Sequence, residues 1–343
     1  MRGEAQNCSR LTRRSSGYAR LASFFLAFLL VTPLAQAQEC ASGSDLDAAT
    51  AHALSRASTS YFQMAAAGDF AGLKQSAIAS VVADFSGIEQ AVGANRDNLQ
   101  QAQATQRTAY LLTATGTSAL PRAEFFCGIF NSLDHVTFVF SNLPPGRYGV
   151  VVDDVSGGKQ PVVLTLILYQ QNGSWKLAGL TVKPRLVAGH DSAWFAAQAA
   201  QYHAKGDNFT AWLYYLEAWD LAEPAGFMYT PARDRIVDAL QPVRPSDAPS
   251  KEHPMLLVSG SDTYRVTETF PDSVGNDLVL VVKYQAVSDI SNTGLTFTVN
   301  SKVIKAMVTR FPGLRDAFAS VVARAVDSSG RDYGTLMSMK DVK

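Results

Sequence analysis

The chain has few cysteines, few histidines and no excess of charge of either sign. Only 3 of its 343 residues are cysteine and 5 are histidine, and 30 basic residues balance 30 acidic ones. A nucleic-acid partner calls for a basic stripe that displaces counterions, so this balance argues against one. The histidines stand too far apart for the usual metal-ligand spacing. We therefore expect no metal and no cofactor.

Catalytic motifs are also missing. The sequence has no G-x-S-x-G elbow, no H-E-x-x-H motif, no C-x-x-C pair and no Walker loop. Asp134 and His135 could form an acid-base dyad if they open into a pocket, although a polar turn at a strand start is the simpler explanation. Asp153 and Asp154 could be paired carboxylates or calcium ligands, but calcium needs several more oxygen ligands. We predict no catalytic residue.

The apolar run near the N-terminus is too short to span a membrane. It covers residues 21–31, about 11 residues where a spanning helix needs about 20. Five arginines precede it, and Ala35-Gln36-Ala37 follows. This is the pattern of a secretory signal peptide over residues 1–37. We expect a periplasmic or secreted mature chain that begins near Gln38, has no membrane span and carries a net charge of about −4.

Loss of this leader leaves two cysteines, Cys40 and Cys127. In an oxidising compartment two cysteines most simply form one disulfide, which would tie the mature N-terminus to the middle of the first domain. The alternative is that Cys127 is a small buried residue in an apolar strand. The sequence leaves both possibilities open.

The pattern of residues 38–187 is helical first and then extended. Apolar residues recur at helical spacing over residues 45–68, 70–78 and 86–103. After Thr105 the period changes to two, and Asn172-Gly173 marks a tight hairpin. The expected strands are residues 108–115, 124–130, 135–140, 148–153, 161–169 and 175–183. Short connections predict an antiparallel meander covered on one face by the helices.

This order resembles the nuclear transport factor 2-like fold. The resemblance is carried by YFQMAAAGDFAGL at residues 61–73 and by the hairpin VVLTLILYQQNGSWKLAGLTVKP at 162–184. It implies a curved sheet that wraps helices around a cone-shaped interior. Enzymes of that family carry an Asp-His pair there, of which the apolar strand faces give little sign. The segment VTFVFSNLPPGRYGVVV at 136–152 is similar instead to prealbumin-like sandwiches, but the preceding helices need a sheet to cover and favour the first resemblance.

Residues 188–241 resemble a single tetratricopeptide unit of two antiparallel helices. Small and aromatic residues take the spacing of that family, with Gly206 in the turn. A solenoid needs about three such units, so this one must pack on something else. Its second helix carries two apolar stripes, one of them formed by Trp212, Leu216 and Trp219. It is therefore expected to be buried on two sides.

Four aromatic residues in this segment are candidate binding residues: Trp194, Trp212, Tyr214 and Trp219. Tryptophan and tyrosine at the edge of a helical pair make good peptide or sugar platforms, and the alternative is packing between domains. A proline-rich linker follows at residues 242–254. Residues 255–343 then read as a small α+β domain with strands at 264–270 and 277–285, a helix or strand-plus-helix at 299–311, and a strand pair at 321–327 and 333–339.

We interpret the chain as an α+β protein: N-terminal helices on a curved antiparallel sheet, a central tetratricopeptide-like helical hairpin and a small C-terminal α+β domain. The leading hypothesis is an exported, non-catalytic binding or scaffolding protein with a protein or peptide partner. The alternative is a small-ligand binder or enzyme that uses the cavity of the first domain, with Asp134 and His135 as its polar groups. Carbohydrate binding through exposed aromatics is a third hypothesis.

Overall fold

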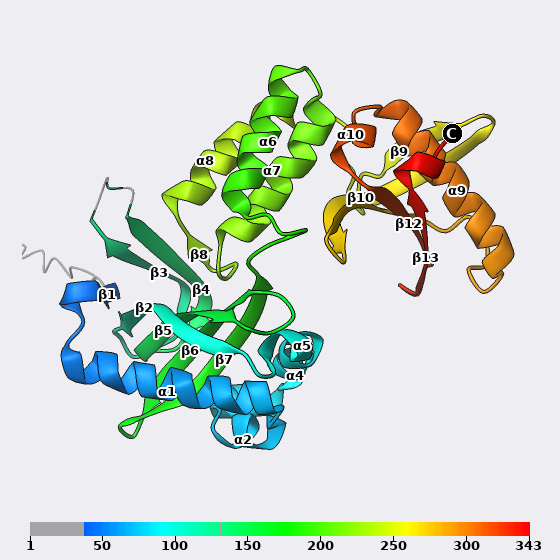
Figure 1. Ribbon diagram of the computed structural model, residues 1–343. Coiled ribbons are helices and arrows are strands. Elements are labelled where there is room, and N and C mark those ends of the chain that lie inside the picture. The colour runs from blue at the N-terminus through cyan, green and yellow to red at the C-terminus, as the bar shows by residue number, and fades with distance from the viewer. Residues whose placement is uncertain (1–37, 130–131, 133) are drawn as a thin grey trace, which may run out of the picture. The chain divides into compact units, whose positions relative to one another are not determined.

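The computed structural model describes residues 38–129, 132 and 134–343, so the predicted leader lies outside the described residues. The described chain is a mixed α+β protein (Figure 1). The described residues belong to one compact unit. In this part of the chain no helix is long and apolar enough to cross a membrane.

A five-stranded antiparallel sheet organises the N-terminal region, in the order β1-β2-β5-β6-β7. Its strands are β1 (Gln38–Ser42), β2 (Gln103–Ala114), β5 (Gly146–Ser156), β6 (Val162–Gln171) and β7 (Ser174–Pro184). The hairpin between β6 and β7 turns at Asn172 and Gly173, both at positive φ, as the sequence predicts. The edge strand β1 was not predicted, because its five residues lack an alternating pattern.

The predicted meander is wrong at one point. All six expected strands form, but β2 pairs directly with β5. The two strands between them in sequence, β3 and β4, form a hairpin that belongs to a second sheet. That sheet consists of β3 (Leu120–Gly128), β4 (His135–Leu143) and β8 (Met228–Tyr229). The reason is that β5 is buried on both faces, at Val150, Val151 and Val152, so a second layer is needed. Phe125 and Phe138 of the hairpin supply that layer, in one apolar cluster with Val150.

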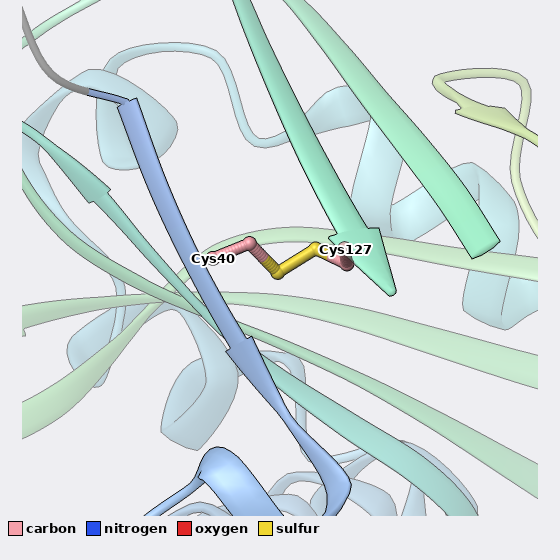
Figure 2. The surroundings of a disulfide bond; sticks show 2 residues. All are labelled: Cys40 and Cys127. Atoms are coloured by element: carbon pink, nitrogen blue, oxygen red, sulfur yellow. A yellow bond between two sulfur atoms is a disulfide. The ribbon is translucent and has the colours of Figure 1, made fainter. Parts of the chain in front are cut away.

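Cys40 and Cys127 are joined in a disulfide, which confirms the first of the two possibilities (Figure 2). The bond links β1 of the first sheet to β3 of the second, across 87 residues of sequence and a Cα–Cα distance of 5.3 Å. Such a bond is typical of proteins that fold in an oxidising compartment.

Five helices cover the other face of the first sheet. They are α1 (Ala48–Ala67), α2 (Phe70–Gln75), α3 (Ala79–Ala83), α4 (Ser86–Ala94) and α5 (Arg96–Leu99). Asp47 caps α1 by accepting the amide of Thr50 at 2.9 Å. A Cβ on Gly149 would stand 2.2 Å from Leu54, so the helix approaches β5 closely only because that position has no side chain. The expected single helix over 86–103 is divided between α4 and α5.

The remaining elements share one large apolar core. Helices α6 (Ser192–Ala204), α7 (Asn208–Ala222) and α8 (Pro231–Leu240) precede a second five-stranded sheet, in the order β13-β12-β11-β10-β9. Its strands are β9 (Met255–Ser259), β10 (Asp262–Val274), β11 (Asp277–Gln285), β12 (Ser320–Val326) and β13 (Asp332–Ser338), with helices α9 (Thr293–Arg310) and α10 (Leu314–Ala317). Short 3₁₀ helices lie at Gly43–Asp45, Gln241–Val243 and Met339–Asp341.

The C-terminal sheet is built around a crossover. Strands β11 and β12 are parallel, and α9 connects them, whereas the other neighbours are antiparallel. The helix packs on the sheet through Asn300, which accepts the Tyr284 hydroxyl at 2.7 Å and donates to Thr335 at 2.9 Å. The predicted pairing of 321–327 with 333–339 is confirmed as β12 with β13. Strand β9 was not predicted.

Candidate functional site

Two aspartates start the helices that build the candidate site. Asp191 accepts the amide of Trp194 at 2.9 Å at the start of α6, and Asp207 accepts the amide of Thr210 at 3.2 Å at the start of α7. Gly206, at φ +81°, provides the turn between the two helices. The turn is short, so α6 and α7 pack side by side as an antiparallel pair.

Helix α7 is buried over most of its circumference. Phe195 and Ala199 of α6 and Ala211 of α7 have no exposed surface. On another side the Tyr214 hydroxyl donates to the carbonyl of Ala317 at 2.7 Å, and burial raises the pKa of this phenol above its usual range. Helix α7 thus has neighbours on two sides, as its two apolar stripes predict.

The four predicted aromatic residues fall into two groups. Trp194 and Tyr214 lie together, with ring centroids 6.0 Å apart, and Trp194 also stacks on His190 at 3.6 Å. Trp212 and Trp219 instead line a separate pocket. Trp212 is only 6% exposed, while Trp219 is half-buried. Trp212 therefore belongs to the wall of a pocket and not to an open flat platform.

That pocket has a volume of about 600 Å³ and lies between α7 and β10; we call it the α7–β10 pocket. Its α7 side consists of Trp212, Leu216, Glu217, Trp219 and Asp220, and its β10 side of residues 268–272. Pro184, Val187 and Pro249 complete the lining. A volume of this size suits a side chain or a small molecule.

Two buried polar side chains of this lining have no partner. Glu217 is 8% exposed as a residue and makes no hydrogen bond or ion pair within the described residues, but its carboxyl oxygens are not among the fully buried unsatisfied atoms, so solvent in the pocket reaches them. Thr269 is 4% exposed, and its Oγ1 likewise lacks a hydrogen-bond partner there. Burial, reinforced by Asp220 and Asp272 and opposed by Lys183, raises the pKa of Glu217 to about 8. Glu217 is therefore largely protonated at neutral pH.

The other acids around Glu217 differ in how they are neutralised. Lys183 donates to the backbone oxygen of Asp220 at 2.6 Å and to its Oδ1 at 3.0 Å. Lys283 pairs with Glu268 at 2.7 Å. Asp272 makes no ion pair among the residues that the structure describes. The same residues include no group of three or more acidic, histidine or cysteine side chains that could hold a metal ion. Glu217 and Asp272 thus make no direct ion pair, although Lys183 acts on Glu217 and Arg324 on Asp272 through longer-range electrostatics.

A second pocket, of about 650 Å³, is lined by Arg107, Arg185, Arg235, Glu223 and residues of α6 and α8. We call it the arginine pocket. Arg107 forms a two-pronged hydrogen bond with Asp154, which Arg185 also approaches at 3.4 Å, and Arg107 lowers the pKa of that aspartate. Asp154, one of the two adjacent acids considered as carboxylate or calcium candidates, is therefore occupied in ion pairs.

Glu223 in the arginine pocket is also paired. Its Oε1 lies 2.7 Å from Nε of Arg233. Burial raises the pKa of Glu223 to about 7, against the lowering effect of Arg233. The guanidinium also lies 5.2 Å from the ring centroid of Trp219 and 4.3 Å from that of Tyr229. Glu223 and the arginines Arg107 and Arg185 of this pocket thus have partners of opposite charge within the protein.

The predicted pair Asp134 and His135 lies apart from both pockets, at the start of β4. Asp134 is exposed, and its amide donates to the Ser132 hydroxyl at 3.2 Å. Nδ1 of His135 is 2.8 Å from the carbonyl of Ser132, and its ring centroid is 5.0 Å from that of Phe126. These contacts are those of a turn, and neither residue lines the α7–β10 pocket.

The interior between the first sheet and its helices is filled by apolar side chains. Leu54 of α1 and Leu164, Leu166 and Leu177 of the sheet have no exposed surface and belong to one cluster. Asp153, 2% exposed, lies at this layer and accepts the hydroxyl of Ser58. Burial raises the pKa of Asp153, while the bond to Ser58 lowers it.

Glu217 and Thr269 were not among the predicted site residues. One signal in the sequence could have found Glu217: it is a carboxylate between Leu216 and Ala218 on a helix that is apolar nearly all round. A charge in such a position is rare in a core. Comparisons of the chain with protein-family models, curated proteins and solved structures return no significant match.

Proposed function

We propose that this is an exported binding protein that takes a segment of a protein or peptide partner into the α7–β10 pocket. The observation that supports this most strongly is the composition of the pocket wall. Two tryptophans adjoin the carboxyl of Glu217, which makes no hydrogen bond within the described residues, and the hydroxyl of Thr269, which is buried and unsatisfied there. Groups of this kind cost stability when left unsatisfied, so they favour a ligand that satisfies them.

Export is proposed on separate grounds. The leader pattern of residues 1–37 and the disulfide between Cys40 and Cys127 both suit a periplasmic or secreted protein. The likenesses to the nuclear transport factor 2-like fold and to a tetratricopeptide unit also stay proposals. Helices on one face of an antiparallel sheet and a paired α6–α7 support them.

The alternative, a small-ligand binder or enzyme that uses the interior of the first domain, has less support. The leucines of the sheet fill the layer under α1, and Asp134 and His135 make turn contacts. Sugar binding on open aromatics has little support as well, because Trp212 is nearly covered.

The experiment is a selection from a peptide display library on the purified protein, followed by affinity measurements. We expect enriched peptides to bind the unaltered protein and to lose at least ten-fold in affinity on Trp219→Ala. Trp175→Ala, on β7 and outside the pocket lining, is the matched control and should leave binding unchanged. Peptides that bind Trp219→Ala as tightly as the unaltered protein would contradict the proposal.

A further inference from the structure

We propose that the group held in the α7–β10 pocket is an organic cation, the ammonium or guanidinium of a basic side chain, with Glu217 and Asp272 as its counter-charges. This inference rests on the proposed function and specifies the chemistry of the partner. It does not follow from the number of acids alone. It follows from which of the four carboxylates in the lining form ion pairs within the protein, and from the buried hydroxyl of Thr269, an independent hydrogen-bond acceptor in the same wall.

The charge balance of the pocket is the first argument. Four carboxylates line it, and the two nearby lysines are committed to two of them, Lys183 to Asp220 and Lys283 to Glu268. Glu217 and Asp272 are left without a direct ion pair; Asp272 is exposed and within electrostatic reach of Arg324, while Glu217 is buried. A ligand with one positive charge would complement this remainder, and an anionic ligand would be repelled.

The hydroxyl of Thr269 is the second, independent argument. Its Oγ1 is buried, lacks a hydrogen-bond partner within the described residues, and belongs to a residue of the pocket wall. A hydroxyl can accept a hydrogen bond from an N–H donor. An ammonium or guanidinium carries three or more such donors, so it can bind a carboxylate and, once the Thr269 side chain turns its buried oxygen toward the pocket, this hydroxyl as well.

Aromatic rings in the wall are suited to the same group. The guanidinium of Arg233 already lies 5.2 Å from the centroid of Trp219, and Nζ of Lys283 lies 5.0 Å from that of Phe270. Both rings line the pocket. These contacts show that cations of the protein already lie over one face of each ring, an interaction that an organic cation of the ligand can also make with an aromatic wall. The described residues offer no cluster suited to a metal ion, which favours an organic cation.

Protonation of Glu217 makes the binding pH-dependent. The charged groups that act on this carboxyl are Asp220 on its own helix, Asp272 on β10 and Lys183 on β7, and the pocket lining adds Glu268 with its partner Lys283. In the free protein its pKa is about 8, so it is mostly neutral at pH 7. A bound cation lowers this pKa and drives off the proton. Affinity is therefore expected to rise with pH from 6 to 8 and to level off above the pKa of the free protein.

The test is titration calorimetry of the full exported chain with capped peptides Ala-Ala-X-Ala-Ala, in which X is lysine, arginine, norleucine or glutamate. We expect the lysine or arginine peptide to bind at least ten-fold more tightly than the norleucine and glutamate peptides. In buffers of different ionisation enthalpy, binding at pH 7 should release close to one proton. Glu217→Gln should weaken binding at least ten-fold and abolish that release.

Controls separate this inference from the proposed function. Asp238→Asn, an exposed acid on α8, changes the net charge equally and should leave binding and proton release unaltered. Asp272→Asn, at an exposed position, should weaken cation binding without risk to folding. Equal affinity for the norleucine peptide, together with a loss on Trp219→Ala, would overturn the cation and leave the pocket as the binding site. Binding of no peptide would overturn both.

Discussion

Asp153 and Glu217 are both buried carboxyl groups, but the two regions that hold them treat them differently. In the N-terminal region Asp153 accepts the hydroxyl of Ser58, and the adjacent Asp154 is paired with Arg107. On α7, by contrast, Glu217 has no partner among the described residues. A satisfied buried acid contributes to the fold, whereas an unsatisfied one costs stability. The difference suggests that Asp153 is structural and that Glu217 serves binding.

The N-terminal region also has a covalent restraint, and its removal is the largest effect that we expect. Replacing both Cys40 and Cys127 by alanine should cost about 4 kcal/mol of unfolding free energy, because the bond closes a loop across 87 residues. Chemical denaturation of oxidised and double-variant protein measures this. A change below about 1 kcal/mol would show that the two sheets hold together without the bond.

The paired acid Glu223 should respond to loss of its partner. Arg233→Ala leaves a buried carboxylate without its counter-charge and removes the guanidinium from Trp219 and Tyr229. We expect a loss of about 3 kcal/mol. Arg235→Ala, exposed on the same helix, is the control and should change stability by less than about 0.5 kcal/mol. An equal loss of stability in Arg233→Ala and Arg235→Ala would contradict the view that Glu223 depends on Arg233 as its counter-charge.

Replacement of Glu217 should have the opposite effect on stability and increase the free energy of unfolding at high pH. Its pKa in the folded protein, about 8, is above the ordinary 4.5, so the stability that its neutral form provides is present below pH 4.5 and is lost as the pH rises to 8. Glu217→Gln removes this loss. We expect the variant to match the unaltered protein near pH 4.5 and to exceed it by about 2 kcal/mol at pH 9, less than full linkage because water can enter the pocket.

Urea unfolding of Glu217→Gln and of the unaltered protein at the two pH values measures this prediction. Asp238→Asn should show no such crossover. If Glu217→Gln is less stable at pH 9, Glu217 has a structural partner and resembles Asp153.

The smallest expected effect concerns Ser58. Ser58→Ala removes the hydrogen bond that lowers the pKa of Asp153, so this pKa, already raised by burial, rises further. The variant should lose about 1 kcal/mol, more at pH 8 than at pH 4, because the ionised form is the one left without a donor. Ser60→Ala, exposed on the same helix, is the control in thermal unfolding at both pH values. A loss that is independent of pH would argue that Asp153 is already protonated.

Local patterns predicted the elements well and their partners poorly. Asn172-Gly173 specifies its hairpin through backbone conformation alone, and Gly206 does the same for the turn between α6 and α7. In contrast, β1 exists because it pairs with β2, and β9 because it pairs with β10. Helix α9 contains several β-branched residues, which left its start ambiguous until the sheet was in place.

The same limit applies to the candidate site. The apolar stripes of α7 predicted its burial, and Trp212 and Trp219 were identified from spacing. Whether Glu217 would find a partner depended on which strand packs against α7, and that strand, β10, lies about fifty residues further along the chain. The grouping of Trp194 with Tyr214 and of Trp212 with Trp219 depended on the same packing.

The disulfide has a consequence for encounters between copies of the protein. Strand β1 occupies an edge of the first sheet beside β2, and an edge strand of five residues is one that another chain can displace. Because Cys40 ties β1 to β3, the strand cannot leave, and β2 stays covered. In the reduced protein this covalent tie is absent, and terminal strands without such a tie are the segments that domain-swapped dimers exchange. The disulfide thus also opposes exchange of β1 between two copies of the protein.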